Sequence, residues 1–257
     1  MRLKIEMVVD CACKTGEKPL WHPDEERLYW VDIPRGRLFR FDPTAGSYEL
    51  CYRSDSAIGG YSIQEDGSLL LFQDRGAVNI WRNGRVIPVI RDASTDADGL
   101  FNDVIADPEG RVFCGMRGDS QRAGRLYRLD ADGQLAKILD NVGEPNGMGF
   151  TCDLKGFYFT DSLVGIIYIF DYDRTSGSIS RQREFIRVPK KDGVPDGMTV
   201  DAGGHVWSAV YGGGYVVRYA PRRNRGDEVQ LPCEEDFLLS IRRPRLYRYV
   251  CYHRWRR

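Results

Sequence analysis

The stretch Leu28-Tyr-Trp-Val-Asp32, followed by Gly36-Arg-Leu-Phe-Arg-Phe-Asp42, contains a short apolar strand, a turn and a second strand rich in aromatic residues. The same unit recurs four more times, and successive units begin 41, 43, 45 and 49 residues apart, at Leu69, Val112, Phe157 and Val206. A period of about 40 to 50 residues is that of a four-stranded propeller blade, whereas solenoids have shorter repeats and sandwiches do not repeat their sequence. The sequence therefore predicts an all-β propeller.

The bulk composition agrees with one domain of this class. A chain of 257 residues buries a sizeable core, and residues 1–257 are expected to form a single propeller domain. No helical periodicity interrupts the strand pattern from Leu3 to about Tyr219. The formal net charge is zero, so neither nucleic acid nor an anionic membrane surface is an expected partner.

The N-terminus and the cysteines indicate the compartment. No run approaches the roughly 20 apolar residues that span a bilayer, and the N-terminal residues are charged where a signal peptide would be apolar. The 7 scattered cysteines do not form a disulfide framework, so we expect a reducing, cytoplasmic environment. We further expect a monomer or a weak homo-oligomer.

The repeat also predicts where a site lies, because the innermost strand of each blade lines the axial channel. Counting back 10 or 11 residues from the start of each unit gives one residue per blade: Glu17, Gly59, Asn102, Asn146 and Asp196. Two carboxylates and two carboxamides therefore share one phase, on different blades, and point at one axis.

Oxygen donors of this kind favour Ca²⁺, Mg²⁺ or Mn²⁺, with Zn²⁺ as a further alternative. By the same count His22 and His205 fall in outer turns, which argues against a histidine-based metal site or a Ser-His-Asp triad. Taken singly, Asn146 and Asp196 also fit ordinary Pro-Asn-Gly and Pro-Asp-Gly turns. The acidic stretch 92–99 lacks the spacing of an EF-hand and is expected to be a solvated or channel-rim loop.

Several motifs together resemble the gluconolactonase / regucalcin (senescence-marker-protein) family over about residues 5 to 220. The motifs are Gly16-Glu17-Lys18-Pro19-Leu20-Trp21, Leu28-Tyr-Trp-Val-Asp-Ile33, Phe101-Asn102-Asp103, Asp107-Pro-Glu-Gly-Arg111, Pro145-Asn146-Gly147-Met148 and Pro195-Asp196-Gly197-Met198. The resemblance implies a six-bladed propeller that binds one divalent metal, with Ca²⁺ as the expected ion, through Glu17, Asn146 and Asp196.

The resemblance also implies a function. It indicates a metal-dependent hydrolase that opens a small lactone or related ester with a metal-activated water, whose proton Asp196 would accept. Asn102 would hold the substrate and help to stabilise the oxyanion, and Asp103 would contact substrate or a metal-bound water. The alternatives are a non-catalytic calcium-binding regulatory protein of the regucalcin type and a propeller scaffold for protein partners.

Two positions depart from the family pattern. Leu100 stands where sugar-lactone members carry an Arg, so the expectation of lactone hydrolysis is firmer than that of a sugar-acid substrate. Lys18 stands where the family has Gly after the metal-binding Glu. Its ammonium would either bind an anionic substrate or point to solvent.

The C-terminal segment departs from the repeat. Residues 221–257 form an anomalous basic tail where the sixth blade should be, so the last blade is expected to be incomplete or aberrant after about residue 220. Reading the codons of Ile241 to Trp255 one base later permits a family-like last strand, which suggests a frameshift between about Ala220 and Ser240. Open blade edges would then lower stability and activity.

Overall fold

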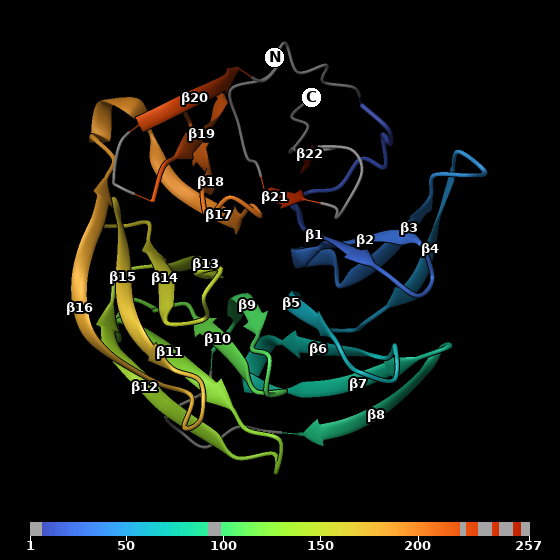
Figure 1. Cartoon of the computed structure of the whole chain (residues 1–257). Helices are drawn as coiled ribbons and strands as arrows, with labels where there is room; N and C mark the ends of the chain where they lie inside the picture. The colour runs from blue at the N-terminus through green and yellow to red at the C-terminus, as the bar shows by residue number, and fades with distance from the viewer. Residues whose placement is uncertain (1–6, 92–98, 222–224, 231–237, 242–248, 253–257) are drawn as a thin grey trace.

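The computed structural model describes residues 7–91, 99–221, 225–230, 238–241 and 249–252. These residues form five four-stranded antiparallel sheets around one axis (Figure 1), and within every sheet the strands follow one another in chain order. The first two sheets contain β1 (Gly16–His22), β2 (Arg27–Asp32), β3 (Arg37–Asp42) and β4 (Ser47–Arg53), then β5 (Ile58–Ile63), β6 (Leu69–Gln73), β7 (Val78–Arg82) and β8 (Arg85–Ile90).

The other three sheets repeat this plan. They contain β9 (Phe101–Ala106), β10 (Val112–Met116), β11 (Gly124–Leu129) and β12 (Leu135–Val142); β13 (Pro145–Phe150), β14 (Gly156–Asp161), β15 (Ile166–Asp173) and β16 (Ser178–Arg187); and β17 (Val194–Val200), β18 (Val206–Tyr211), β19 (Tyr215–Tyr219) and β20 (Arg225–Gln230). Short 3-10 turns occur at Ile33–Arg35, Asp74–Gly76 and Lys190–Asp192. The propeller prediction is confirmed, and the repeated unit of the sequence is the second and third strand of each blade.

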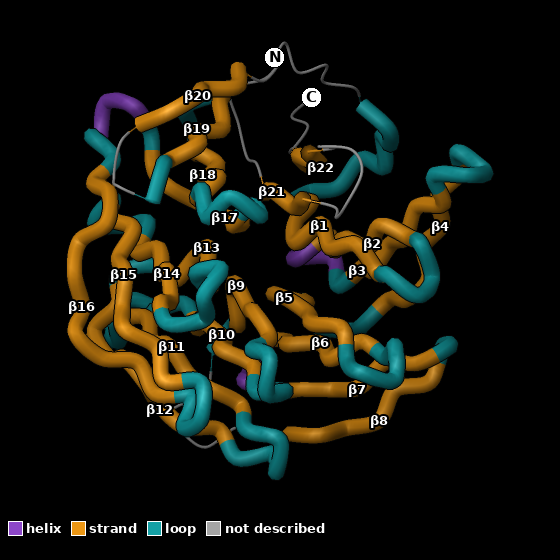
Figure 2. Tube along the Cα trace, in the orientation of Figure 1, coloured by secondary structure: helices purple, strands orange, loops and turns teal. Residues whose placement is uncertain are grey.

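The first strand of each blade is the innermost one (Figure 2), and β9 packs against β5 on one side and β13 on the other. Burial follows this order, because β14 is buried along its whole length whereas β4 is mostly exposed. Between blades the core is aromatic. Phe72 of one blade meets Phe101 of the next edge to face, with ring centroids 5.3 Å apart, a favourable geometry for two aromatic rings.

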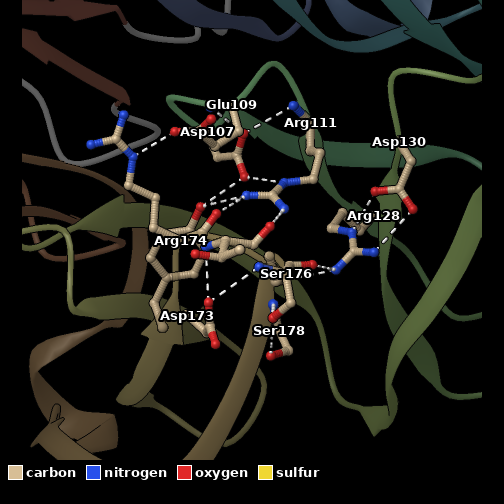
Figure 3. A network of polar contacts seen from close by, with 12 residues as sticks. Asp107, Glu109, Arg111, Arg128, Asp130, Asp173, Arg174, Ser176 and Ser178 are labelled. Atoms are coloured by element: carbon tan, nitrogen blue, oxygen red, sulfur yellow. Dashed lines mark hydrogen bonds and ion pairs between the residues drawn. The ribbon is translucent and has the colours of Figure 1, made fainter.

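Arginine networks connect the third and fourth blades (Figure 3). They lie at the end opposite the start of the inner strands, since Asp107 directly follows the last residue of β9. Arg111 donates to Asp107 Oδ2 over 2.6 Å, and the Tyr172 hydroxyl donates to the same oxygen over 2.7 Å. Arg128 binds Asp130 and also donates to the carbonyl of Gly177 in the β15–β16 turn. Because these hydrogen bonds are bidentate or partly buried, they hold the third and fourth blades in a fixed position relative to each other.

The expectation of six blades is corrected. The described residues form five four-stranded blades and a two-stranded sheet of β21 (Leu238–Ile241) and β22 (Tyr249–Tyr252). β21 packs against β17 on one side and β1 on the other, so it lies in the sector where a sixth blade would stand. The repeat unit is absent from the sequence after Tyr219, which is why no further four-stranded sheet forms from the described residues. The regular part also extends past residue 220, since β20 completes the fifth blade.

Three further expectations concern segments that the structure covers only in part, and the first is that an N-terminal strand at about Leu3 to Val9 completes the last blade. Met7, Val8 and Val9 are not in a strand, so the described part of the N-terminal segment adds none to the last blade. The acidic loop at 92–98 and most of residues 241–255, which the frameshift hypothesis reads one base later, lie outside the described residues. No helix in the described ranges is long and apolar enough to cross a membrane.

Candidate active site at the channel end

The candidate ligands lie at the leading ends of four inner strands. Glu17, Asn102 and Asn146 are the second residues of β1, β9 and β13, and Asp196 is the third residue of β17. All four are nearly buried, with relative exposures of 9% or less. The prediction that these four residues lie at equivalent positions near the start of the inner strands is therefore confirmed.

The second blade contributes no polar side chain at this phase, for a steric reason. A Cβ atom at Gly59 of β5 would lie 1.6 Å from the carbonyl oxygen of Phe101 on β9. Glycine lets the two inner strands approach this closely. The site therefore draws on the other four blades.

β1 is irregular where it carries the site. Its pairing with β2 shifts register between Glu17 and Leu20, and Lys18 has a φ of 57°, in the left-handed region that favours glycine. The buried hydroxyl of Tyr61, on β5, donates to the Lys18 carbonyl oxygen over 2.7 Å. Burial raises the pKa of Tyr61 well above its ordinary value, so the hydroxyl remains a donor. Tyr61 thus fixes the bulge that presents Glu17 and Lys18, a role that the one-dimensional phase count does not reveal.

The Lys18 side chain turns into the site. Its Nζ lies 3.2 Å from Asp103 Oδ1 and 3.5 Å from Glu17 Oε2, and its side chain is 6% exposed. Burial alone would lower the pKa of this ammonium, but Asp103, Glu17 and Asp196 together raise it above 10.5. The ammonium is therefore charged at neutral pH, and the alternative that Lys18 points to solvent is wrong.

Two proline carbonyl oxygens beside the candidate ligands accept hydrogen bonds from the preceding blade. The buried Asn102 Nδ2 donates to Pro145 O over 2.7 Å, and Ser162 Oγ donates to Pro195 O over 2.6 Å. Because each acceptor directly precedes Asn146 or Asp196, these bonds position the two candidate ligands. Ser162 comes from the loop after β14, which the phase count does not examine.

β13 and β17 approach each other closely at the same level. A Cβ at Gly147 would lie 2.6 Å from the carbonyl oxygen of Asp196 and 2.5 Å from the amide nitrogen of Met198. This glycine follows Asn146 directly, so its missing side chain is what brings the Asn146 and Asp196 strands together.

The side-chain oxygen of Asn146 indicates that these residues fit a metal ion. Asn146 Oδ1 is buried and has no hydrogen-bond partner in the described part of the chain, and neither has Oγ1 of Thr160, which pairs with Asn146 across β13 and β14. An orphaned buried carbonyl oxygen is costly unless a donor or a cation satisfies it. With the carboxylates of Glu17 and Asp196 it makes a donor set of oxygens only, which fits a hard divalent cation.

The described residues contain no group of three or more His, Cys, Asp or Glu side chains arranged to hold a metal. The candidate set has two carboxylates and an amide, so it does not amount to such a group. His22 is not in an outer turn as expected: it ends β1, is buried, and its Nε2 lies 2.9 Å from the Gly67 carbonyl oxygen. Leu100 packs against the apolar cluster of the first two blades, so it brings no cation to the site.

The chain is similar to known proteins over most of its length. A family model described as the SMP-30/Gluconolactonase/LRE-like region matches residues 15–237. A pentonolactonase of Haloferax volcanii is 50% identical over 220 residues, which are 84% of this chain and 74% of that protein. Regucalcin of Gallus gallus is 31% identical over 242 residues, covering 91% of this chain and 81% of its own length.

Solved structures share the fold. The calcium-binding protein regucalcin from Agrobacterium tumefaciens superposes with a TM-score of 0.82 at 23% identity, covering 90% of this chain and 79% of its own. A luciferin-regenerating enzyme gives the same TM-score at 24% identity, with coverages of 90% and 80%. At sequence identities below 25%, these superpositions show that the chain shares the propeller fold.

Proposed function

Because the chain belongs to the SMP-30/gluconolactonase/LRE-like family, we propose that it is a metal-dependent hydrolase that opens a small sugar-acid lactone at the channel end. The pentonolactonase relative, at 50% identity, supports a five-carbon lactone as the first substrate to test. The orphaned, buried Asn146 Oδ1, on the inner strand that packs against the strand of Asp196, is the single observation that carries the metal requirement.

Glu17, Asn146 and Asp196 would hold the ion, and Ca²⁺ is the ion we propose, with Zn²⁺, Mg²⁺ and Mn²⁺ as alternatives. A divalent cation bound there supplies a Lewis acid that polarises the lactone carbonyl. The regucalcin relatives support calcium as the first choice.

The chain's own side chains would carry the remaining steps. The Asp196 carboxylate would accept a proton from the attacking water. Asn102 uses one amide N–H on Pro145 O, which orients the amide, and the other would donate to the substrate as negative charge develops on its oxygen. Asp103 and Lys18, which form an ion pair, would contact the hydroxyl groups of the substrate, and the Lys18 ammonium would also contact the carboxylate that ring opening produces.

Lactone opening releases a proton, so it can be followed in weakly buffered solution with a pH indicator. We expect Ca²⁺-dependent turnover of a pentonolactone above the spontaneous rate, and a loss of at least a hundredfold in Asp196→Ala. A matched change at an outer turn, Asp132→Ala, should retain full activity. An Asp196→Ala enzyme with undiminished turnover would remove the proposed role of Asp196.

The second candidate is a non-catalytic calcium-binding regulator, which the 31% identity to regucalcin favours. Stoichiometric calcium binding without turnover of any lactone or aryl ester would support this candidate over the first. Calcium-dependent turnover would exclude it.

We also propose that the sector between β17 and β1 stands in for a sixth blade of the family's propeller. Only β21 and β22 are described there, and a sheet of two strands leaves more edge unpaired than a full blade does. Incomplete closure would lower stability and activity. A chain extended with a complete last blade should then unfold at a higher temperature.

A further inference from the structure

An ammonium group lies among the acidic side chains of the candidate site. Lys18 Nζ is within 3.5 Å of Glu17 Oε2 and 3.2 Å of Asp103 Oδ1. It also interacts electrostatically with Asp196. Two of these three carboxylates, Glu17 and Asp196, are the ones proposed to bind the metal. Lys18 therefore occupies the same negative potential that would attract a divalent cation.

The charges of the cluster show what this implies. When all three carboxylates are ionised they carry three negative charges, and the ammonium neutralises one of them before any ion enters. A divalent ion then brings the cluster to neutrality, whereas without the ammonium one negative charge would remain. In a buried site each charge acts at low effective dielectric, so the ammonium repels an entering cation strongly.

The backbone keeps the ammonium in place. Lys18 has a φ of 57°, a conformation in which any side chain costs energy relative to glycine. The Tyr61 hydroxyl holds the Lys18 carbonyl, and the side chain is almost completely buried. The ammonium is thus a fixed part of the site and not a surface group that passes by it.

We propose that Lys18 is a built-in competing cation that weakens the affinity of the channel site for divalent metal ions. This inference rests on the proposed metal site. It makes this chain a weak, exchangeable binder compared with a chain that has an uncharged residue at the position. Replacing Lys18 by an uncharged residue should therefore tighten metal binding, although most substitutions in a site weaken it.

The test is calorimetric titration of CaCl₂ into the chelator-treated full chain. Lys18→Met keeps the length of the side chain and removes the charge, whereas Lys18→Gly removes the charge and suits the left-handed backbone, so one of the two should fold even if the other does not. Lys137→Met is the matched control, since it removes an ammonium that pairs with Asp140 on the outer strand β12, where it is 39% exposed.

We expect both Lys18 variants to bind Ca²⁺ at least tenfold more tightly than the wild type and Lys137→Met, a difference of about 1.4 kcal/mol. Ca²⁺ should also raise the thermal midpoint of the Lys18 variants more than that of the wild type. Binding by the Lys18 variants alone would support the inference in its strongest form.

Equal or weaker binding by the Lys18 variants, with measurable binding by the wild type, would overturn the inference and leave the proposed metal site standing. Failure of every variant to bind Ca²⁺, Mg²⁺, Mn²⁺ or Zn²⁺ would overturn both. The two failures are therefore distinguishable in one experiment.

Discussion

The hydrogen bond from Tyr61 to the Lys18 carbonyl makes a sharp prediction about the bulge of β1. Tyr61→Phe removes only the hydroxyl, which donates over 2.7 Å inside the protein, where Tyr61 is 2% exposed. The substitution leaves the Lys18 carbonyl oxygen buried without this donor, on a backbone already at a φ of 57°. Tyr61→Phe should therefore destabilise the chain although the ring and its packing are preserved.

The magnitude follows from the cost of an unsatisfied buried acceptor, about 1 to 3 kcal/mol. For a domain of this size, that cost corresponds to a fall in thermal midpoint of about 2 to 10 °C. Differential scanning calorimetry of the metal-free protein, with urea unfolding as a second measure, resolves a shift of this size.

Tyr48→Phe is the matched control. Its hydroxyl also donates to a backbone carbonyl, that of Asp10, but over 3.3 Å at an exposed position. Water replaces such a bond, so the control should lose less than about 0.5 kcal/mol. If Tyr61→Phe lost no more stability than Tyr48→Phe, the claim that Tyr61 holds the bulge would be wrong.

Three further predictions concern the site and its support. Gly147→Ala places a Cβ 2.5 Å from the backbone nitrogen of Met198, so it should lower the free energy of unfolding by about 1 to 3 kcal/mol and weaken Ca²⁺ binding. The control is Gly203→Ala, whose Cβ meets only side-chain atoms at 3.1 Å or more, and which should unfold near the wild-type midpoint. Asn146→Leu removes an orphaned buried oxygen, so the metal-free variant should be at least as stable as the metal-free wild type. Calorimetry should detect no Ca²⁺ binding by this variant, and tight binding would contradict the ligand role of Asn146. Burial alone would raise the pKa of Asp201, but hydrogen bonds from Trp207, His205 and Arg218 outweigh this effect and lower the pKa to about 2. The stability that this carboxylate contributes is therefore present above about pH 4 and lost as the pH falls toward 2. Asp201→Asn should be about 1 kcal/mol less stable than the wild type at pH 7, after allowance for solvent screening. A difference in unfolding free energy between the two proteins that persisted at pH 2 would contradict this linkage.

The repeat was enough to predict the blades and the strand positions of the site. Because every blade has the same four strands, a fixed offset from Leu28 or Phe157 leads to the leading end of the inner strand, where Glu17 and Asn146 lie. In the second blade an offset of 10 residues, one fewer, leads from Leu69 to Gly59, whose role is close packing and not chemistry. A periodic count thus finds positions but cannot distinguish ligands from spacers.

The rest of the site depends on contacts between residues distant in the sequence. The inward direction of Lys18 depends on a bulge and on Tyr61, 43 residues away, and neither leaves a periodic signal. The support of Asp196 by Ser162 likewise joins two blades through a loop. The number of blades was overestimated because family resemblance predicts six, whereas the repeat in this chain stops after Tyr219 and only β21 and β22 are described beyond the fifth blade.

The central claim is that lactone opening requires one divalent ion held by Glu17, Asn146 and Asp196. Its most direct test is the rate of pentonolactone hydrolysis by the chelator-treated protein as Ca²⁺ is added back, with bound metal measured in the same samples. The account predicts no turnover above the spontaneous rate without metal, and a rate that rises in proportion to occupancy and saturates at one ion per chain. Undiminished turnover by a metal-free protein, or full metal occupancy without turnover, would contradict it.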